Sequence, residues 1–199
     1  MEATTCQRCG AALLSYETTI HLTGLVPDKT EILCSGCFNK QAAMLMGLKI
    51  EELDPQLIEI RGRGRKKHVF FISRMIHPTG IALKAIEIQD GEQKGYQIGV
   101  NGDLDCNQAE LYEKLIKKVK KQVSRKYLEV RKIGWEKKPC IKDFEVAGRI
   151  EWDENYDGRI PLVVIDGKEY TWMELGEMLM SFEGWNFKLK IFDFSEDED

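Results

Sequence analysis

Four of the six cysteines stand as two Cys-x-x-Cys pairs, Cys6/Cys9 and Cys34/Cys37. Structural zinc sites are tetrahedral, with four ligands and Zn–S bonds of ~2.3 Å, and a Cys-x-x-Cys turn presents two sulfurs to one point. Gly10 follows the first pair, where a tight turn favours a residue without a side chain. Four sulfurs leave no open position for water, so such a site is structural and not catalytic. The spacing therefore predicts one structural Zn²⁺ ion held by these four cysteines.

Other cysteine chemistries stay open at this point: four buried free thiols, a redox pair, or an iron–sulfur cluster. Cys106 and Cys140 have no partner at ligand spacing, which favours ordinary reduced thiols. The three histidines, His21, His68 and His77, lie far apart in the sequence, and we expect strand or turn positions for them.

The two cysteine pairs are 24 residues apart, so the chain between them must reverse its direction. Strand-forming residues at 13–22 and 30–33, with turn residues at 26–29, predict a β-hairpin. A helix is predicted from Cys37 to Leu48, ending near Gly47. Its positive N-terminal end would favour the thiolates of the second pair.

A cysteine turn, a hairpin and a helix that opens with two more cysteines resemble the treble-clef class of zinc fingers, over residues 4–48. The resemblance implies that Cys6 and Cys9 are the knuckle ligands, while Cys34 and Cys37 are the helix-start ligands. Residues 166–185 are also similar to the end of bacterial zinc-ribbon proteins, a likeness that implies no activity. Treble clefts serve nucleic-acid binding, protein binding and scaffolding, so this fold implies no single function.

The net charge of −4 hides a strong polarity along the chain. Residues 1–60 carry −4, residues 61–138 carry 19 basic and 9 acidic side chains (+10), and residues 139–199 carry −10. Electrostatic potentials act locally, so the middle segment can attract an anion although the whole chain is acidic. The alternative is that the acidic third folds against the basic third and neutralises it.

A glycine-spaced basic run is the second candidate site. It predicts a flexible arm along a phosphate backbone, because each neutralised phosphate releases counterions. Its five side chains are Arg61, Arg63, Arg65, Lys66 and Lys67. The alternative is a solvated loop between two strands. Phe70 and Phe71 follow the run and either stack on bases or form part of a buried strand.

The middle segment alternates strand-like runs with turns and then turns helical. Apolar residues at helical spacing predict one long amphipathic helix with a basic face, and Asn107 stands where its N-cap belongs. The predicted strands are 57–60, 68–76, 81–88 and 95–100, and the predicted helix is 108–132.

The last third predicts two strands, a helix and a final strand, at 147–152, 160–165, 171–182 and 185–192. The helix opens with the capping box Thr171-x-x-Glu174. Residues 195–199 form an acidic tail, which we expect to be a solvated end.

No motif of a known catalytic site occurs in the sequence, so we expect no enzyme. Four acidic residues resemble a hydrolase metal site, but they stand where hairpin turns require acidic residues. They are Asp153, Glu154, Asp157 and Asp166. No apolar run approaches the ~20 residues of a membrane span. Without a recognisable secretory signal, a cytoplasmic location with reduced thiols is expected.

We therefore predict an α+β protein in three parts. These are a four-cysteine zinc module (1–55), a basic strand-and-helix segment (56–138) and an acidic β-β-α-β module with its tail (139–199). The function expected from this arrangement is zinc-stabilised, non-catalytic binding, either of nucleic acid through residues 61–68 and the basic helix or in a regulatory role. The alternative is a protein-interaction adaptor that uses the acidic module, and an unrecognised enzyme comes third. No membrane partner is expected.

Overall fold

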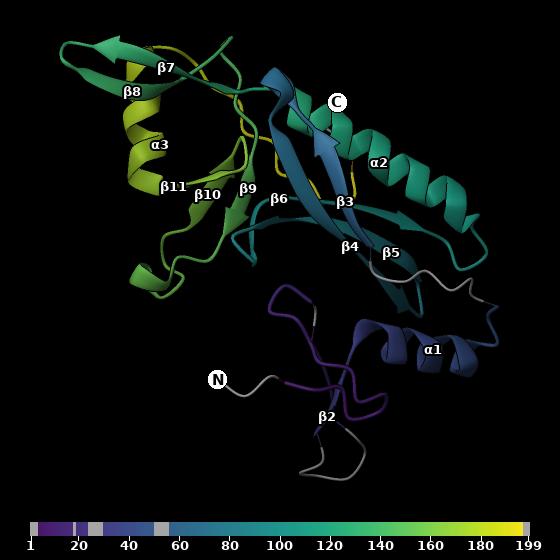
Figure 1. Cartoon of the computed structure of the whole chain (residues 1–199). Helices are drawn as coiled ribbons and strands as arrows, with labels where there is room; N and C mark the ends of the chain where they lie inside the picture. Colours follow the sequence, from purple (N-terminus) through teal and green to yellow (C-terminus); the bar gives the residue numbers. More distant parts are fainter. Residues whose placement is uncertain (1–3, 18, 24–29, 50–55, 197–199) are drawn as a thin grey trace.

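The computed structural model of the chain describes residues 4–17, 19–23, 30–49 and 56–196. Within these ranges the protein combines helices with antiparallel strands in four small sheets, which confirms the predicted α+β class. A cysteine-bearing module lies against the central sheet, and a C-terminal module lies beside that sheet, at the upper left of Figure 1. None of the helices in the described ranges is long and apolar enough to cross a membrane.

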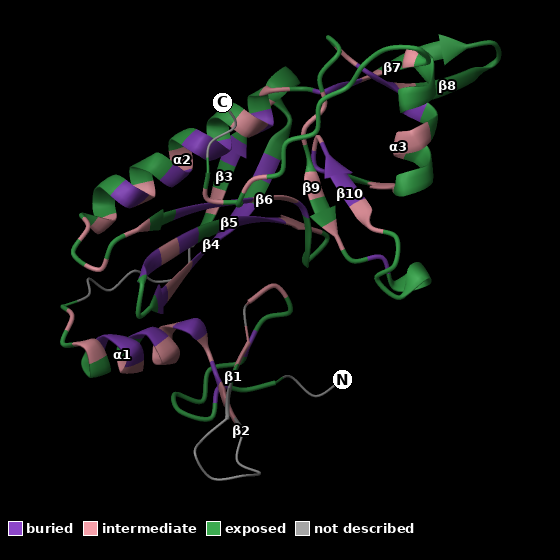
Figure 2. Ribbon diagram, turned by 180° about the vertical axis from the view of Figure 1, so that it is seen from behind, coloured by how far each residue is buried: buried purple, intermediate pink, exposed green. Residues whose placement is uncertain are grey.

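Four antiparallel strands in chain order form the central sheet, and they confirm the four strands predicted for the middle segment. They are β3 (Gln56–Arg61), β4 (Lys67–His77), β5 (Gly80–Gln89) and β6 (Glu92–Gly102). One face of the sheet carries a continuous apolar set, and helix α2 (Gln108–Ser124) covers it with buried residues at helical spacing. These helix residues are Leu111, Leu115, Val119 and Val123, and they lie on the purple face of α2 (Figure 2).

Helix α2 begins where the sequence predicts and ends earlier. The Asn107 side chain accepts hydrogen bonds from the backbone N–H groups of Ala109 and Glu110, at 3.0 and 3.3 Å, and so caps the helix. The prediction of a helix up to residue 132 is wrong: Arg125 is already extended, and strand β7 (Leu128–Ile133) follows. Apolar spacing alone does not show where α2 ends and β7 begins, because the hydrogen bonds that hold the start of β7 come from a distant part of the chain.

The cysteine module contains a hairpin and a helix, as predicted, but the first strand is shorter than the predicted 13–22, and the predicted turn at 26–29 lies outside the described residues. Strands β1 (Ile20–Thr23) and β2 (Thr30–Leu33) pair antiparallel, and α1 (Ser35–Met46) follows them. Among the described residues the pairing of β3 with β4 extends only to Ile72, so the following residues of β4 have no described strand on that side. Asn39 of α1 takes up this edge: its side chain donates to Arg74 O (2.8 Å) and accepts from Ile76 N (3.0 Å). The helix is thereby fixed to the central sheet.

The C-terminal module contains two more sheets and a short helix around a separate apolar cluster. Strand β7 pairs with β8 (Glu136–Ile141), and the other sheet has the order β11-β10-β9. Its strands are β9 (Arg149–Glu151), β10 (Leu162–Ile165) and β11 (Lys168–Thr171), and helix α3 (Trp172–Leu179) follows them. The module also has two 3₁₀ turns, η2 (Glu154–Tyr156) and η3 (Met180–Phe182), while a third, η1 (Arg63–Arg65), joins β3 to β4 of the central sheet. The predicted capping box is present, with mutual bonds between Thr171 and Glu174.

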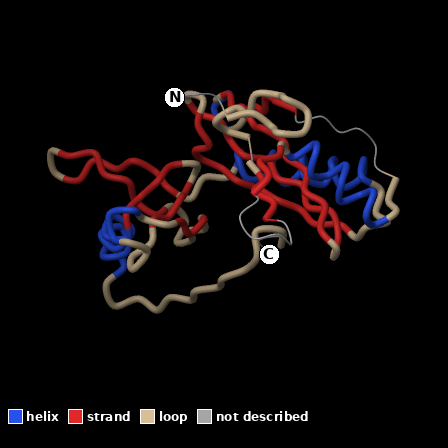
Figure 3. The backbone as a smooth tube through the Cα atoms, turned by 90° about the horizontal axis from the view of Figure 1, so that it is seen from below, coloured by secondary structure: helices blue, strands red, loops and turns tan. Residues whose placement is uncertain are grey.

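The chain after α3 differs from the prediction. Residues 185–192 alternate apolar and polar, yet they pair with no strand of the described structure. Instead they run as an extended loop back to the central sheet (Figure 3). Phe187, Leu189 and Ile191 are 89%, 72% and 73% exposed. Alternation defines a face, but a strand also needs a free edge to pair with, and here the segment meets none.

The end of this loop is anchored on the central sheet. The Phe194 ring lies over Gly99 of β6, where a Cβ atom would come within 2.2 Å of it, and Lys84 stacks above the ring at 4.7 Å. The buried Lys118 of α2 donates to the carbonyl oxygens of Phe194 and Glu196. The start of the predicted solvated tail is therefore held by backbone contacts, while residues 197–199 lie outside the described ranges.

One Asp-Gly turn joins the C-terminal module to the rest. Residues 166 and 167 are the two-residue turn between β10 and β11, and both have positive φ, as a type I′ hairpin turn needs. The Asp166 carboxylate accepts from Tyr127 N (3.0 Å) and Leu128 N (2.9 Å), which fixes the start of β7. A Cβ atom on Gly167 would lie 2.7 Å from the Tyr96 ring of β6, so only glycine allows this approach. In the described chain, the apolar cluster of the central sheet ends at Val123 and that of the C-terminal module begins at Tyr127, so the boundary between the two cores lies between these residues.

We predict that Asp166→Asn destabilises the C-terminal module by about 1–3 kcal/mol, because one of two partly buried N–H groups loses its acceptor. Asparagine tolerates the left-handed backbone, so strain does not confound the result. All four tryptophans follow residue 128, so urea unfolding followed by tryptophan fluorescence reports on this module. Asp90→Asn is the matched control, because Asp90 also precedes glycine at φ 53° and is exposed. Equal midpoints for both variants would contradict the assigned role of Asp166.

Candidate functional site: a four-cysteine cluster and a basic cavity

The structure brings together all four cysteines of the predicted ligand set. The four Sγ atoms lie within 4.8 Å of one another, and the Sγ atoms of Cys9 and Cys34 are 3.8 Å apart. In a tetrahedron with Zn–S bonds of ~2.3 Å the sulfurs are about 3.8 Å apart, so this pair already has the spacing of a shared metal ion. The cluster is a candidate metal centre.

Backbone hydrogen bonds shape the first cysteine turn. Cys6 N donates to Ala11 O (2.8 Å) and Gly10 N donates to Cys6 O (2.9 Å), with Gly10 at φ 72° in the left-handed region that glycine favours. Gln7 attaches the turn to β2, because its N–H donates to Ile32 O and its side chain accepts from Ile32 N, both at 2.9 Å. Cys6 and Cys9 are thus directed toward the second pair by the hairpin itself.

The second pair is placed by the start of α1. Cys34 is the N-cap residue, and its Sγ accepts from Cys37 N at 3.3 Å. The predicted helix start is therefore two residues late, since α1 begins at Ser35. Unpaired N–H groups and the helix dipole make this end of a helix favourable for negatively charged sulfur.

The four thiols have different acidities. For Cys6 burial raises the pKa, but backbone N–H donors, chiefly those of Cys34, Cys9 and Arg8, outweigh it and bring the pKa down to about 6. Burial, together with the neighbouring sulfurs, raises the pKa of Cys37 to about 12, and burial also raises the pKa of Cys34. Four thiolates at this spacing repel one another unless a cation lies between them, which is the role a divalent metal ion would have here.

The other candidates from the sequence stay apart from this cluster. Among the described residues no second group of His, Cys, Asp or Glu side chains has metal-ligand geometry, so Cys106 and Cys140 lie outside any such set. His68 is buried in β4, with its Nδ1 2.7 Å from Glu87 Oε1. The acidic side chains serve local structure: Asp153, for example, accepts from Asn155 N at the start of η2.

The basic run forms a hairpin turn between β3 and β4 instead of a flexible arm. Gly62 N donates to Lys66 O (2.9 Å), and residues 63–65 form the 3₁₀ turn η1. Lys67 pairs with Glu59 at 3.1 Å. The exposed side chains of the run that make no ion pair with any described residue are Arg61, Arg63, Arg65 and Lys66.

The two phenylalanines next to the turn do not offer stacking surfaces. Phe70 and Phe71 are 0% and 2% exposed, one on each face of the sheet. Of the two interpretations of Val69–Ile72, the buried strand is confirmed and base stacking is excluded for these rings.

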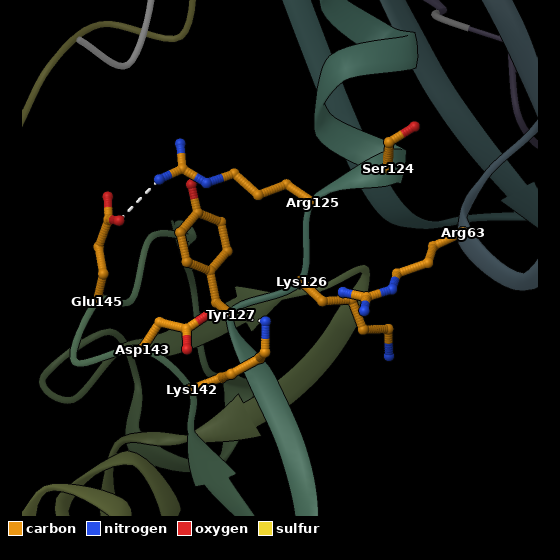
Figure 4. A pocket seen from close by; sticks show the side chains of 8 residues that line it. All are labelled: Arg63, Ser124, Arg125, Lys126, Tyr127, Lys142, Asp143 and Glu145. Atoms are coloured by element: carbon orange, nitrogen blue, oxygen red, sulfur yellow. Dashed lines mark hydrogen bonds and ion pairs between the residues drawn. The ribbon is translucent and has the colours of Figure 1, made fainter.

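Arg63 projects from the turn into a cavity of about 290 Å³ at the junction between the central sheet and the C-terminal module (Figure 4). The cavity is lined by Arg63, Ser124, Arg125, Lys126, Tyr127, Lys142, Asp143 and Glu145. Arg125 pairs with Glu145 and Lys142 pairs with Asp143, both at 2.7 Å. Four cations and two carboxylates leave a formal charge of +2, carried by Arg63 and Lys126. The acidic third therefore neutralises this site only in part.

The sequence predicts binding through Arg63 in the basic run and through the basic helix at 108–132, which includes Arg125 and Lys126, but it does not join them in one cavity. Lys142 is an isolated cation in the acidic third and carries no such prediction. No local signal joins residues 63, 126 and 142, because they meet only when β7 and β8 return beside the β3–β4 turn.

Comparisons with known proteins cover most of the chain outside the cysteine module. Residues 51–124 match a family model described as a domain of unknown function (DUF7686), and residues 129–196 match another described as a domain of unknown function (DUF7713). No curated protein and no solved structure matches the chain. The two matches meet at residues 125–128, the segment that lines the basic cavity.

We predict that the purified protein binds about one metal ion per chain through the four cysteines. Cys37→Ser should abolish tight binding, because a shared metal ion needs all four sulfurs for its full affinity. The metal content by elemental analysis is the measurement, and Cys106→Ser is the control, since Cys106 lies outside the cluster. Metal retained by Cys37→Ser, or lost by Cys106→Ser, would contradict the assigned ligand set.

Proposed function

We propose that this protein is a zinc-stabilised, non-catalytic nucleic-acid-binding protein. Zinc is the metal that a closed set of four thiolates favours, and such sets hold domains together without an open position for a reacting water. The turn–hairpin–helix layout of residues 4–49 supports a treble-clef module with this ion at its centre. In this proposal the metal has a structural role and the polyanion binds elsewhere.

The observation that carries the binding proposal is the convergence of cations from distant segments on one cavity. Arg63 comes from the β3–β4 turn, Lys126 from the linker after α2, and Lys142 from the end of β8. Such a concentration of positive charge on a chain of net charge −4 attracts a polyanion locally. Arginine in particular offers paired N–H donors that suit phosphate oxygens.

The β7–β8 hairpin extends this positive surface. It projects from the molecule, and its outer half is exposed (Figure 2). Its exposed cations are Arg131, Lys132, Lys137 and Lys138. Trp135 at the tip is 97% exposed, with the Lys132 ammonium 5.9 Å from its ring centroid. An exposed aromatic ring among cations is a combination that nucleic-acid-binding surfaces use, which supports the same class of partner.

A protein-interaction adaptor is the second candidate. The loop after α3 exposes Phe187, Leu189 and Ile191 on an unpaired, alternating segment, which is the pattern of a strand that completes a partner's sheet. This segment carries Lys188 and Lys190 between the apolar residues, and it lies outside the cation-lined cavity. The two candidates therefore use separate surfaces, and experiments on one leave the other intact.

We predict that cobalt substitutes for the bound metal and gives the absorption of a tetrahedral thiolate site. Four sulfur ligands impose this geometry and give intense sulfur-to-metal charge-transfer bands. Chelation of the metal should unfold residues 4–49, because metal-binding energy in such modules, ~10–16 kcal/mol, is also folding energy. Circular dichroism before and after chelation measures this change. A five- or six-coordinate cobalt spectrum would argue against the structural role.

We predict that the double variant Arg63→Ala/Lys126→Ala weakens polynucleotide binding. If both side chains contact phosphates, the slope of log affinity against log salt should fall by roughly 1.4–1.8, at ~0.7–0.9 per contact. Fluorescence anisotropy with labelled DNA and RNA over a salt series gives this slope. The charge-matched control is Lys188→Ala/Lys190→Ala, which removes two exposed cations that do not line the cavity. Equal slopes in the two variants would refute a cavity-centred phosphate site.

A further inference from the structure

A group of three aromatic rings lies beside the basic cavity. The rings of Phe144 and Trp185 are stacked, with centroids 5.4 Å apart and planes at 22°. Phe182 contacts both rings edge-on, at 6.0 and 5.9 Å. Phe144 is 75% exposed and Trp185 is 64% exposed, so the stack holds its rings in place while it presents aromatic surface to solvent. We call this group the ring stack.

The loop that carries Phe144 also lines the cavity. Asp143 and Glu145 contribute to the cavity wall, while Phe144 between them contacts Trp185. Because consecutive Cα atoms are 3.8 Å apart, the ring stack and the cavity lie within one residue of each other along the backbone. A ligand in the cavity therefore lies next to the residue that carries the exposed Phe144 ring.

The backbone of this loop is strained. Asp143 and Phe144 have φ of 54° and 60°, the left-handed region that a bulky residue such as phenylalanine rarely adopts. Hydrogen bonds hold the loop in this form: Lys142 N donates to Tyr127 O (2.7 Å) and Glu145 N donates to Lys142 O (3.3 Å). Strain of this kind persists where surrounding structure enforces it, and it concentrates at binding sites.

We propose that the cavity and the ring stack together bind a single-stranded segment of nucleic acid. A phosphate group lies near Arg63 and Lys126, and a neighbouring base stacks on Phe144. This inference rests on the proposed function and names the form of nucleic acid that the site selects. Cations alone bind single and double strands alike, whereas stacking needs a base whose flat face is free. In a duplex the neighbouring base pairs cover that face, so the ring stack favours an unpaired strand.

The test compares three labelled oligonucleotides of roughly 12 nucleotides, a length within the site sizes of single-strand binders. They are a single strand of thymidines, a duplex, and a strand of the same length whose sugars carry no bases. Anisotropy titrations of the full-length protein should give the tightest binding for the thymidine strand. Phe144→Leu keeps an apolar side chain and removes the aromatic face, so it should weaken thymidine-strand binding about 5- to 150-fold. Binding of the duplex and of the base-free strand should stay unchanged.

Two further variants separate stacking from structural support. Phe144→Trp retains an aromatic face and should keep thymidine-strand binding within a few-fold of the wild-type affinity, taken as roughly 0.5 kcal/mol or less. Phe187→Leu is the matched control, because Phe187 is 89% exposed and makes no ring contact with the described residues. It should bind all three oligonucleotides like the wild type.

The outcomes separate this inference from the function on which it rests. If the wild type binds none of the three oligonucleotides, nucleic-acid binding itself is refuted. If the wild type binds all three equally, or if Phe144→Leu binds the thymidine strand like the wild type, nucleic-acid binding stands and the stacking site is refuted. Equal loss in Phe144→Leu and Phe144→Trp would also overturn it, since the residue would then act only as structural support.

Discussion

The hydrogen bonds of the Asp166 carboxylate hold the start of the C-terminal module and the cavity loop in place. They fix the backbone of residues 127 and 128, and Tyr127 O in turn accepts from Lys142 N, so the cavity loop follows from the same anchor. Gly167, the next residue, packs on Tyr96 of the central sheet, whose phenol pKa is raised by burial and by nearby carboxylates. A single two-residue turn thus joins β7, the central sheet and the cavity. The left-handed conformation of both turn residues is the reason that Asp and Gly stand there.

The second constraint is that both faces of the central sheet must be covered, whereas the one long helix can lie on only one of them. Helix α2 covers most of one face, and helix α1 packs on the same face beside β4. On the other face, Phe71 is buried against Tyr16 of the cysteine module, with ring centroids 5.5 Å apart, and Gly99 lies under Phe194 from the C-terminal loop. Ser15 and Tyr16 add hydrogen bonds to the β5–β6 turn. The cysteine module and the end of the chain therefore pack on the same face of the sheet, although they come from opposite ends of the sequence.

The fold brings part of the acidic third against the basic third and leaves other cations of the basic third exposed. Among the described residues, the acidic third forms an ion pair with the basic third at Arg125–Glu145 and supplies Asp143 to the same cavity. Most cations of the β3–β4 turn and of the β7–β8 hairpin stay exposed. The fold thus leaves a positive surface on an acidic protein, which supports the proposed polyanion partner.

The grouping of the four cysteines, the four strands of the central sheet and the helix caps at Asn107 and Thr171 could all be predicted from the sequence. These features are local: they depend on spacing, periodicity and the bonding of one side chain to its own turn. Only the tertiary structure decided where α2 ends, since Asp166 lies 38 residues from Leu128 along the chain. It also left residues 185–192 unpaired and placed Arg63 beside Lys126 and Lys142. Contacts between distant segments produce no periodic pattern in the sequence of either segment, because each contact depends on a surface that the other segment supplies.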